Sequence, residues 1–255
     1  MSNPPRGEIA LVLGVMVDAV NLADAIRTVD AWITGPRPSY VCIAPAHAIM
    51  DYRRDPELLR IVNASGLTTP DGMSIVWLLR LMGHKNVERV YGPDLMLAVC
   101  ERSLLTGWKH FLNGGAPGVA QELSRRIEQR FPGLAVAGTY TPPFRPLTPE
   151  EDRAVIEQIR ASGADIVWVG ISTPKQERWM ADHVGRVGAP VLIGVGAAFD
   201  FLSGRKPQAP RWMQRSGLEW LFRLATEPRR LWRRYAEYPL FALLVAVQLL
   251  GLRRD

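Results

Sequence analysis

One short turn of the chain carries an acidic side chain in a position suited to catalysis. Thr69-Pro70-Asp71-Gly72 precedes the apolar run Met73–Met82, which has a helical pattern. A carboxylate at such a turn suits a general base, because in a dry pocket it can accept a proton from a bound hydroxyl. On the residues alone, capping the following helix is the simpler role for Asp71. The turn therefore leaves two roles open, a general base or a helix cap.

A second turn offers an amide beside a carboxylate. Ser172-Thr173-Pro174 follows an apolar run that is predicted as a strand, and Pro174 suits the start of a helix. Gln176 and Glu177 would then lie in the first helical turn. Gln176 can both donate and accept hydrogen bonds, so it suits a polar ligand. A capping arrangement by Thr173 and Gln176 is the alternative.

Glycines follow two further predicted strands. Asn113-Gly114-Gly115 opens one turn and Gly194-Val195-Gly196 opens another. Glycines let backbone N–H groups approach a phosphate or ribose, and a following helix N-terminus favours an anion. Neither turn completes G-x-G-x-x-G, so a nicotinamide dinucleotide is not expected. Each turn also has a purely structural interpretation as a tight turn.

The chain lacks the usual patterns of a metal site. It contains no Asp-x-Asp, no HExxH, no CxxC and no Walker lysine, and its four histidines show no ligand spacing. We expect neither a bound metal nor a cofactor. Any phosphate group of a substrate would then have to be neutralised by positively charged side chains.

Positive charge is concentrated in the last fifth of the chain. Residues 205–255 hold eleven Arg or Lys and four acids, a net +7, whereas the rest of the chain is close to neutral. Such a segment suits the phosphates of a nucleotide, a nucleic acid or an anionic membrane, or is simply a solvated helix face. Arg230, Arg233 and Arg234 would share one helix face, while Pro228 is expected to restart the helix after Arg223. Without a recognisable binding module, we expect no nucleic-acid partner.

Apolar runs alternate with helical patterns up to residue 200, which predicts an α/β fold with a mostly parallel sheet. Capping boxes predict helices that begin after Asn21 and after Thr148, the latter ending near Ser162. Beyond Gly204 the strand-like runs stop and helical patterns follow. We therefore expect a catalytic body over 1–204 and a basic helical appendage over 205–255. The expected strands are Ile9–Val17, Tyr40–Ala44, Val87–Tyr91, Lys109–Asn113, Leu134–Ala137, Asp165–Gly170 and Pro190–Gly196.

Composition and the chain ends bear on the compartment. The 255 residues are 47% apolar and 22% charged, as in a folded protein, and the two cysteines exclude a disulfide scaffold. With no targeting segment visible, we expect a cytoplasmic protein. Leu240–Leu252 is apolar except for Gln248, yet shorter than the roughly 20 residues that span a bilayer. It predicts either a surface-lying segment with Arg253 and Arg254 at the headgroups, or a buried helix or dimer contact.

Four stretches of the chain resemble the WecG/TagA/CpsF glycosyltransferases, glycosyltransferase family 26, and together they cover roughly residues 9–238. They are TPDGMSIVW (69–77), YGPDLM (91–96), GISTPKQERWM (170–180) and GVGAAFDFLSGRKPQAPRWMQRSGLEWLFRLATEPRRLWRRY (194–235).

The resemblance implies a Rossmann-like α/β body with a C-terminal appendage. It also implies an inverting, metal-independent transfer of a sugar from a UDP-sugar, often UDP-N-acetylmannosamine or its uronic acid, to a polyprenyl-diphosphate-linked saccharide. Such an enzyme would lie peripherally on the inner face of the membrane and is often a homo-oligomer that associates through its body. Asp71 would be the catalytic base and the appendage arginines would hold the diphosphate. The expected substrate-binding residues are His47, Thr69, Asn113, Gly114, Gly115, Gln176, Glu177, Gly196, Arg223, Arg230 and Arg233.

One departure from the family pattern affects the substrate. The family commonly has T-x-N where this chain has Ile43-Ala44-Pro45, followed by Ala46-His47. His47 either replaces the missing polar pair or only caps a helix, so the donor and acceptor sugars stay open. A non-catalytic, membrane-associated protein of polysaccharide assembly is the alternative function.

Overall fold

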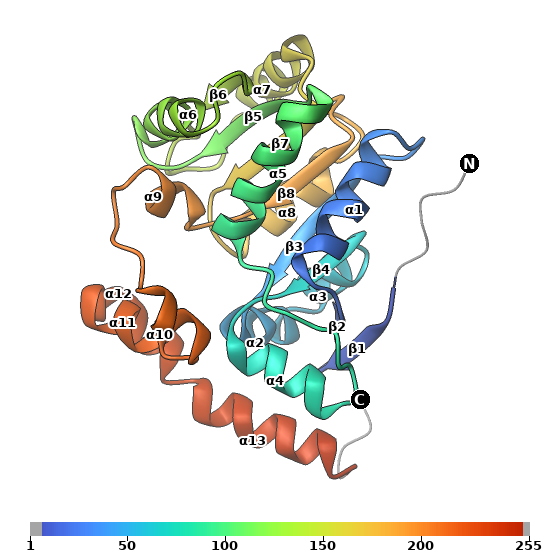
Figure 1. Cartoon of the computed structure of the whole chain (residues 1–255), viewed down its shortest axis with the longest axis vertical. Coiled ribbons are helices and arrows are strands. Elements are labelled where there is room, and N and C mark those ends of the chain that lie inside the picture. The colour runs from blue at the N-terminus through green and yellow to red at the C-terminus, as the bar shows by residue number, and fades with distance from the viewer. Residues whose placement is uncertain (1–6, 252–255) are drawn as a thin grey trace.

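A six-stranded sheet forms the centre of the computed structural model, which describes residues 7–251 (Figure 1). Its strand order is β4-β3-β8-β7-β5-β6, and every neighbouring pair is parallel. The four central strands are almost entirely buried, as expected when helices cover both faces of a sheet. This Rossmann-like α/β fold confirms the predicted fold class. The strands are β3 (Ser39–Ala44), β4 (Leu67–Pro70), β5 (Lys109–Gly114), β6 (Ala135–Tyr140), β7 (Ile166–Gly170) and β8 (Val191–Gly194).

Two hydrophobic cores lie on opposite faces of this sheet. In β3, for example, Tyr40 and Cys42 enter one core while Val41 and Ile43 enter the other, because successive side chains of a strand point to opposite faces. One core is shared with α1 (Leu22–Ile33), α5 (Gly92–Thr106), α6 (Val119–Arg130) and α9 (Ala198–Leu202). The other is shared with α2 (Ala46–Arg54), α3 (Pro56–Asn63), α4 (Met73–Leu81), α7 (Pro149–Ser162) and α8 (Lys175–His183).

Both predicted capping boxes are present. Asn21 and Asp24 cap α1, and Thr148 and Glu151 cap α7, each pair exchanging side-chain and backbone hydrogen bonds. The helix predicted from Thr148 ends at Ser162, with Gly163 in the left-handed conformation that commonly terminates a helix.

The segment predicted as one strand over Ile9–Val17 is instead an antiparallel hairpin. It consists of β1 (Ile9–Val12) and β2 (Val15–Asp18), in a separate two-stranded sheet. Leu13 and Gly14 both have positive φ angles, 50° and 88°, which is the geometry of a two-residue hairpin turn. The apolar pattern runs without a break through Ile9–Val17, so it gave no indication of the turn at Leu13 and Gly14.

The predicted strand Val87–Tyr91 was also wrong. These residues form an extended connection between α4 and α5, in which the Val90 N–H donates to Pro70 O. One of the two edge strands of the sheet is β4, where the sequence had predicted only a turn. With just four residues, two of them threonine, β4 offers too short a pattern to recognise.

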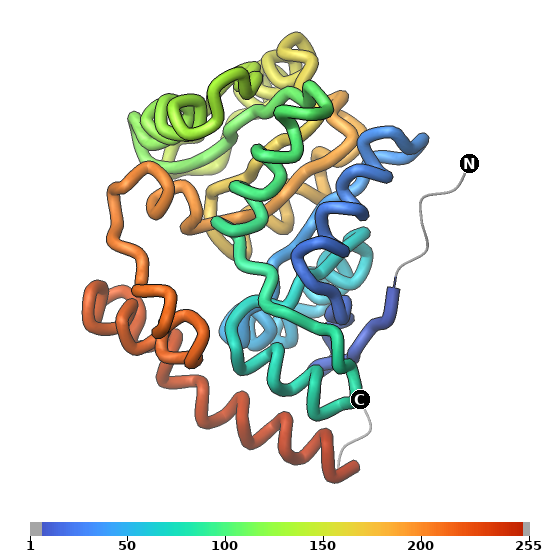
Figure 2. The backbone as a smooth tube through the Cα atoms, in the orientation of Figure 1, coloured from blue at the N-terminus to red at the C-terminus, as the bar shows by residue number. Residues whose placement is uncertain are grey.

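The chain continues after α9 into four further helices, as Figure 2 traces. They are α10 (Arg211–Arg215), α11 (Glu219–Thr226), α12 (Pro228–Tyr235) and α13 (Tyr238–Leu249). Pro228 begins α12, as predicted. We call this set the C-terminal helices.

The last of the C-terminal helices is fixed to the rest of the protein. The Gln248 amide donates to Leu11 O (2.7 Å) and accepts from the Leu13 N–H (2.9 Å), so it pairs with the backbone of the hairpin. Phe241 is buried in the core that also contains α2 and α4. Other α13 side chains, such as Leu243, are exposed, so the segment is both a packed helix and an apolar surface. Arg253 and Arg254 lie outside the described residues.

Within residues 7–251, every helix falls short of the combined length and apolarity needed to cross a bilayer.

We predict that Gln248→Ala destabilises the protein by about 1–3 kcal/mol, because it leaves two backbone groups of the hairpin without their partner. Urea unfolding would measure the loss. The matched control is Gln121→Ala on α6, an exposed position where the free energy of unfolding should stay within about 0.5 kcal/mol of wild type. Equal stabilities for the two variants would show that Gln248 does not hold α13 in place.

Candidate active site

The predicted site residues lie at one edge of the sheet. His47 follows β3, Asp71 follows β4, Asn113 is the second-to-last residue of β5, Gln176 follows β7 and Gly196 follows β8. Because all six strands are parallel, their carboxyl ends meet at the same edge, which is where ligands bind in such folds. The strand order places Asp71 toward one end of this edge and Asn113 toward the other.

A cavity of about 1040 Å³ opens at the Asn113 end of this edge. Its walls include Asn113, Gly115, Gly196 and Arg230, so it joins both predicted glycine turns to the C-terminal helices. The Pro-rich connection 142–149 between β6 and α7 forms another wall. This volume is at the upper end of what small-molecule sites need. His47, Asp71 and Gln176 lie outside the lining of this cavity.

The turn after β5 requires glycine. A Cβ on Gly114 would lie 2.6 Å from the Gly170 carbonyl group, because the ends of β5 and β7 approach closely there. The Gly115 N–H donates to Gly170 O (3.0 Å). Asn113 is buried beside this turn, and its Oδ1 has no hydrogen-bond partner among the described residues. A buried amide oxygen without a partner is a candidate ligand-binding atom.

Glu177 anchors the neighbouring Gln176. The buried Glu177 carboxylate accepts hydrogen bonds from Tyr52 Oη (2.9 Å), Thr173 Oγ1 (2.8 Å) and Gln176 Nε2 (3.2 Å). Burial raises the pKa of Glu177, while these three bonds act in the opposite direction. Gln176 Oε1 is buried without a partner among residues 7–251. No side chain caps α8, so the alternative capping role of Thr173 and Gln176 is absent.

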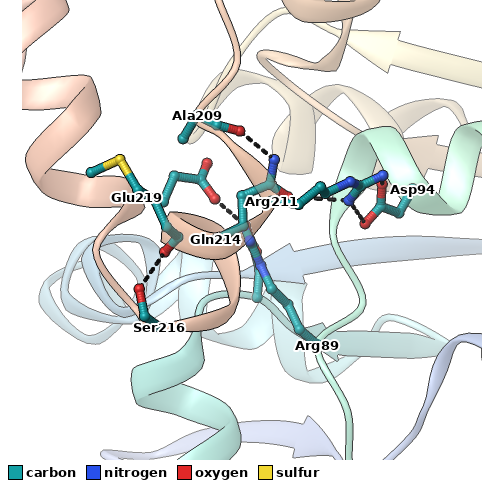
Figure 3. Close-up of polar contacts among 9 residues, drawn as sticks. Arg89, Asp94, Ala209, Arg211, Gln214, Ser216 and Glu219 are labelled. Atoms are coloured by element: carbon teal, nitrogen blue, oxygen red, sulfur yellow. Dashed lines mark hydrogen bonds and ion pairs between the residues drawn. The ribbon is translucent and has the colours of Figure 1, made fainter.

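Asp71 forms an ion pair and does not cap α4. Gly72 is the N-cap of α4, without a side-chain hydrogen bond, whereas Asp71 Oδ1 accepts from Arg89 Nε (2.8 Å). Arg89 Nη2 lies 2.7 Å from Glu219 Oε2, at the start of α11 (Figure 3). The three side chains are only 11–15% exposed. We call this arrangement the Arg89 bridge, since one guanidinium holds two carboxylates.

The Arg89 bridge is a strongly charged, mostly buried feature. Burial lowers the pKa of Arg89, but the negative charges of the Asp71 and Glu219 carboxylates raise it by more. The net shift of the Arg89 pKa is therefore upward. The guanidinium also lies 4.0 Å from the centre of the Tyr91 ring. Arg89 and Glu219 were missed in the sequence analysis. Arg89 lies two residues before the stretch 91–96, and Glu219 lies inside the stretch 194–235. Both stretches had been used only for the family resemblance.

Thr69 contributes less directly. It is fully buried, and its hydroxyl donates to Val90 O (3.4 Å). This bond joins β4 to the connection that carries Arg89. Thr69 therefore helps to place the Arg89 bridge.

Three arginines of the C-terminal helices act on His47. Burial lowers the pKa of His47, and the positive charges of Arg234, Arg223 and Arg230 lower it further. His47 Nδ1 is buried with no partner among the described residues. His47 lies in the first turn of α2, whose N-cap is Pro45. A neutral imidazole at this position can donate or accept a hydrogen bond.

Arg223 of the C-terminal helices lies within electrostatic reach of Asp71. Burial lowers the pKa of Arg223, but Tyr235, Tyr91, Glu219 and Asp71 raise it, with a net upward shift. Its Nε is buried without a hydrogen-bond partner in the described part of the chain. Arg223 is thus a partly buried cation whose buried Nε is an unused donor near the predicted base.

The other two predicted arginines differ in environment. Arg230 pairs with both oxygens of Glu227 at 2.7 Å, and Lys206 joins the same carboxylate at 2.9 Å. Arg233 is exposed, with its guanidinium 5.4 Å from the centre of the Trp232 ring.

No group of three or more His, Cys, Asp or Glu side chains within residues 7–251 is placed to hold a metal ion.

Comparison with known proteins identifies the family. The sequence profile of the glycosyl transferase WecG/TagA/CpsF family matches residues 10–255. This protein belongs to that family. The WecG/TagA/CpsF assignment agrees with a curated relative from Bacillus spizizenii, N-acetylglucosaminyldiphosphoundecaprenol N-acetyl-beta-D-mannosaminyltransferase. The two are 30% identical over 192 residues, which are 75% of this chain and 72% of the relative.

We predict that His47 stays neutral well below the usual histidine pKa of about 6.5, and that Arg234→Gln raises its pKa by removing a positive neighbour. NMR titration of the His47 ring signals would measure both. The control is Arg229→Gln, an exposed position on the same helix α12, which should leave the titration unchanged. A wild-type midpoint near the usual value would show that the arginines do not approach His47.

Proposed function

We propose that this glycosyltransferase moves a sugar from a UDP-sugar to an undecaprenyl-diphosphate-linked saccharide, with inversion and without a metal ion. The donor sugar is of the N-acetylmannosamine type or another hexose. The observation that carries the proposal is that Asp71 lies at the carboxyl ends of the strands, within electrostatic reach of the partly buried Arg223. The name of the Bacillus spizizenii relative supports the lipid-linked acceptor.

The large cavity would bind the UDP portion of the donor. Asn113 Oδ1 is suited to hydrogen-bond the uridine, and the glycine turns at Gly115 and Gly196, which lack side chains, let the diphosphate approach the backbone closely. Arg230 lines the same cavity and would exchange its pair with Glu227 for a phosphate oxygen. Guanidinium groups bind phosphate oxygens with two parallel donors, which makes them suitable replacements for a metal ion.

The reaction would be a direct displacement at the anomeric carbon. Asp71 accepts the proton of the acceptor hydroxyl, and that oxygen forms a bond to the anomeric carbon. The bond between this carbon and the diphosphate oxygen breaks, and its electron pair leaves with UDP. Arg223, Arg230 and Arg233 would stabilise the charge that develops on the diphosphate. Gln176 and the neutral His47 would hydrogen-bond the sugar hydroxyls.

The two segments of the chain have different roles in this proposal. We propose that residues 1–204 bind the donor and supply the base, while residues 205–255 supply the arginines and the membrane contact. Exposed apolar side chains of the C-terminal helices support this membrane contact, since tryptophan and leucine favour the bilayer interface. The exposed Trp77 ring of α4 packs against Gly217 and extends this surface. The exposed residues are Trp77, Leu81, Trp212, Leu218, Trp232, Leu240, Leu243 and Leu250.

The enzyme would then lie on the inner face of the plasma membrane, where UDP-sugars and the lipid-linked acceptor meet. Because α4 contributes to this surface, we favour a lipid contact over a subunit contact for its exposed face.

We predict that Asp71→Asn keeps UDP binding but lowers the transfer rate by about 10²–10⁴-fold, because the base is lost. Thermal shift with UDP would report binding, and UDP release with a short lipid-diphosphate acceptor would report turnover. Glu101→Gln, at an exposed position on α5, is the control. Turnover within a few-fold of wild type would exclude Asp71 as the base. Lipid binding without any UDP release by the wild type would favour the non-catalytic alternative.

We also predict that replacing Trp212 and Leu243 together by serine lowers binding to vesicles rich in anionic lipid by about tenfold, since two interfacial side chains are lost. Transfer to a water-soluble acceptor should persist. Leu105→Ser, at an exposed position on α5, is the matched control in co-sedimentation. Unchanged vesicle binding of the double variant would place the membrane contact elsewhere.

A further inference from the structure

The Arg89 bridge joins the predicted base to the C-terminal helices. Asp71 comes from the end of β4, Arg89 from the connection between α4 and α5, and Glu219 from the start of α11. Nε and Nη2 of the same guanidinium take the two carboxylates at 2.8 Å and 2.7 Å. An arginine that holds one carboxylate neutralises it, whereas an arginine shared by two carboxylates leaves one negative charge on the group.

We propose that Glu219 is a positioning residue that makes the basicity of Asp71 depend on docking of the C-terminal helices; this rests on the proposed function. With the helices docked, Glu219 takes part of the Arg89 charge, and Asp71 remains able to accept a proton. With the helices displaced, Arg89 pairs with Asp71 alone, and its undivided positive charge opposes transfer of a proton to that carboxylate. The base would therefore work only when the diphosphate-binding arginines of the same helices are also present.

The other ionisable groups considered around Asp71 keep the same charge over the working pH range, so the charge at Glu219 is the one that a substitution can change. Arg89 and Arg223 have raised pKa values and stay charged over the working range. Burial, together with the negative charges of Glu219 and Asp71 among others, raises the pKa of Tyr91 and of Tyr238, so both phenols stay protonated. Removing Glu219 therefore changes the charge around Asp71 without compensating titration of Arg89, Arg223, Tyr91 or Tyr238.

A second ion pair provides a matched control. Arg211 of α10 holds both oxygens of Asp94 of α5 at 2.8 Å, so it also fixes the C-terminal helices to the body (Figure 3). Arg211 further bonds Gln214, whose Nε2 donates to Ala209 O. This pair shares the docking function of Glu219 but makes no contact with Asp71. Its loss measures the effect of weaker docking alone.

The first experiment compares pH profiles of kcat for Glu219→Gln and Arg211→Gln. Glu219→Gln should lower kcat by about tenfold, as expected for a weaker base, and shift the acidic limb of the profile to lower pH. The KM for the UDP-sugar should stay within about twofold, since the donor cavity is untouched. Arg211→Gln should lower kcat but keep the acidic limb at its wild-type pH, because only the docked molecules turn over and these retain Glu219 beside Arg89. Glu219→Asp, which retains the charge, should also keep the wild-type limb.

The second experiment tests whether Glu219 acts through Arg89. Lysine has no fork of donors and cannot hold both carboxylates in this geometry. Arg89→Lys combined with Glu219→Gln should therefore lower kcat no more than about twofold below the worse single variant, a failure of additivity expected of coupled residues. The effects of Glu219→Gln and Arg211→Gln should instead multiply. Circular dichroism and urea unfolding would verify that each variant is folded. If Glu219→Gln unfolds, the pH profiles of Glu219→Asp and Arg89→Lys are compared instead.

The outcomes separate the two proposals. A wild-type acidic limb and kcat in Glu219→Gln, with Asp71→Asn inactive, would overturn the role of Glu219 and leave the proposed function intact. Full multiplication of the Arg89→Lys and Glu219→Gln effects would also overturn it. Absence of transfer by the wild type, or full activity of Asp71→Asn, would overturn the proposed function and the inference together.

Discussion

A single guanidinium shared between two carboxylates is the interaction on which the site depends. Charged groups that are mostly removed from water are stable only when each has its partners, and loss of one partner leaves an uncompensated charge. Arg89 therefore fixes three segments relative to one another: the end of β4, the connection before α5, and the start of α11. This requirement places the C-terminal helices, with their arginines, against the ligand edge of the sheet.

The parallel sheet supplies the remaining geometry. Its strands end at one edge and carry Asn113, Gln176 and Gly196 to the same side as Asp71. Buried partners then fix individual side chains, as Tyr52 and Glu177 do for Gln176. Several buried polar atoms at this edge, Asn113 Oδ1 and Gln176 Oε1 among them, lack a partner among residues 7–251. Polar atoms that are buried and unbonded are costly, and a bound polar ligand would satisfy them.

Local patterns were sufficient for much of the fold. The capping boxes at Asn21 and Thr148, the long apolar strands and the helix restart at Pro228 each depend on neighbouring residues, and the structure confirms them. The hairpin at Leu13 and the edge strand β4 were missed because a two-residue turn and a four-residue strand give weak patterns. Arg89 and Glu219 were missed for a different reason. An ion pair between distant segments leaves no spacing in the sequence, so only the three-dimensional structure could reveal it.

The central claim is that Asp71, the proposed base, and the C-terminal arginines serve one bound diphosphate while the Arg89 bridge stays closed. A crystal structure of the complex with UDP would test it most directly. We expect the diphosphate against Arg223 and Arg230, with Arg89 still between Asp71 and Glu219. A structure in which Arg89 leaves both carboxylates to bind the phosphates, or in which the diphosphate lies beyond the reach of Arg223 and Arg230, would contradict the claim.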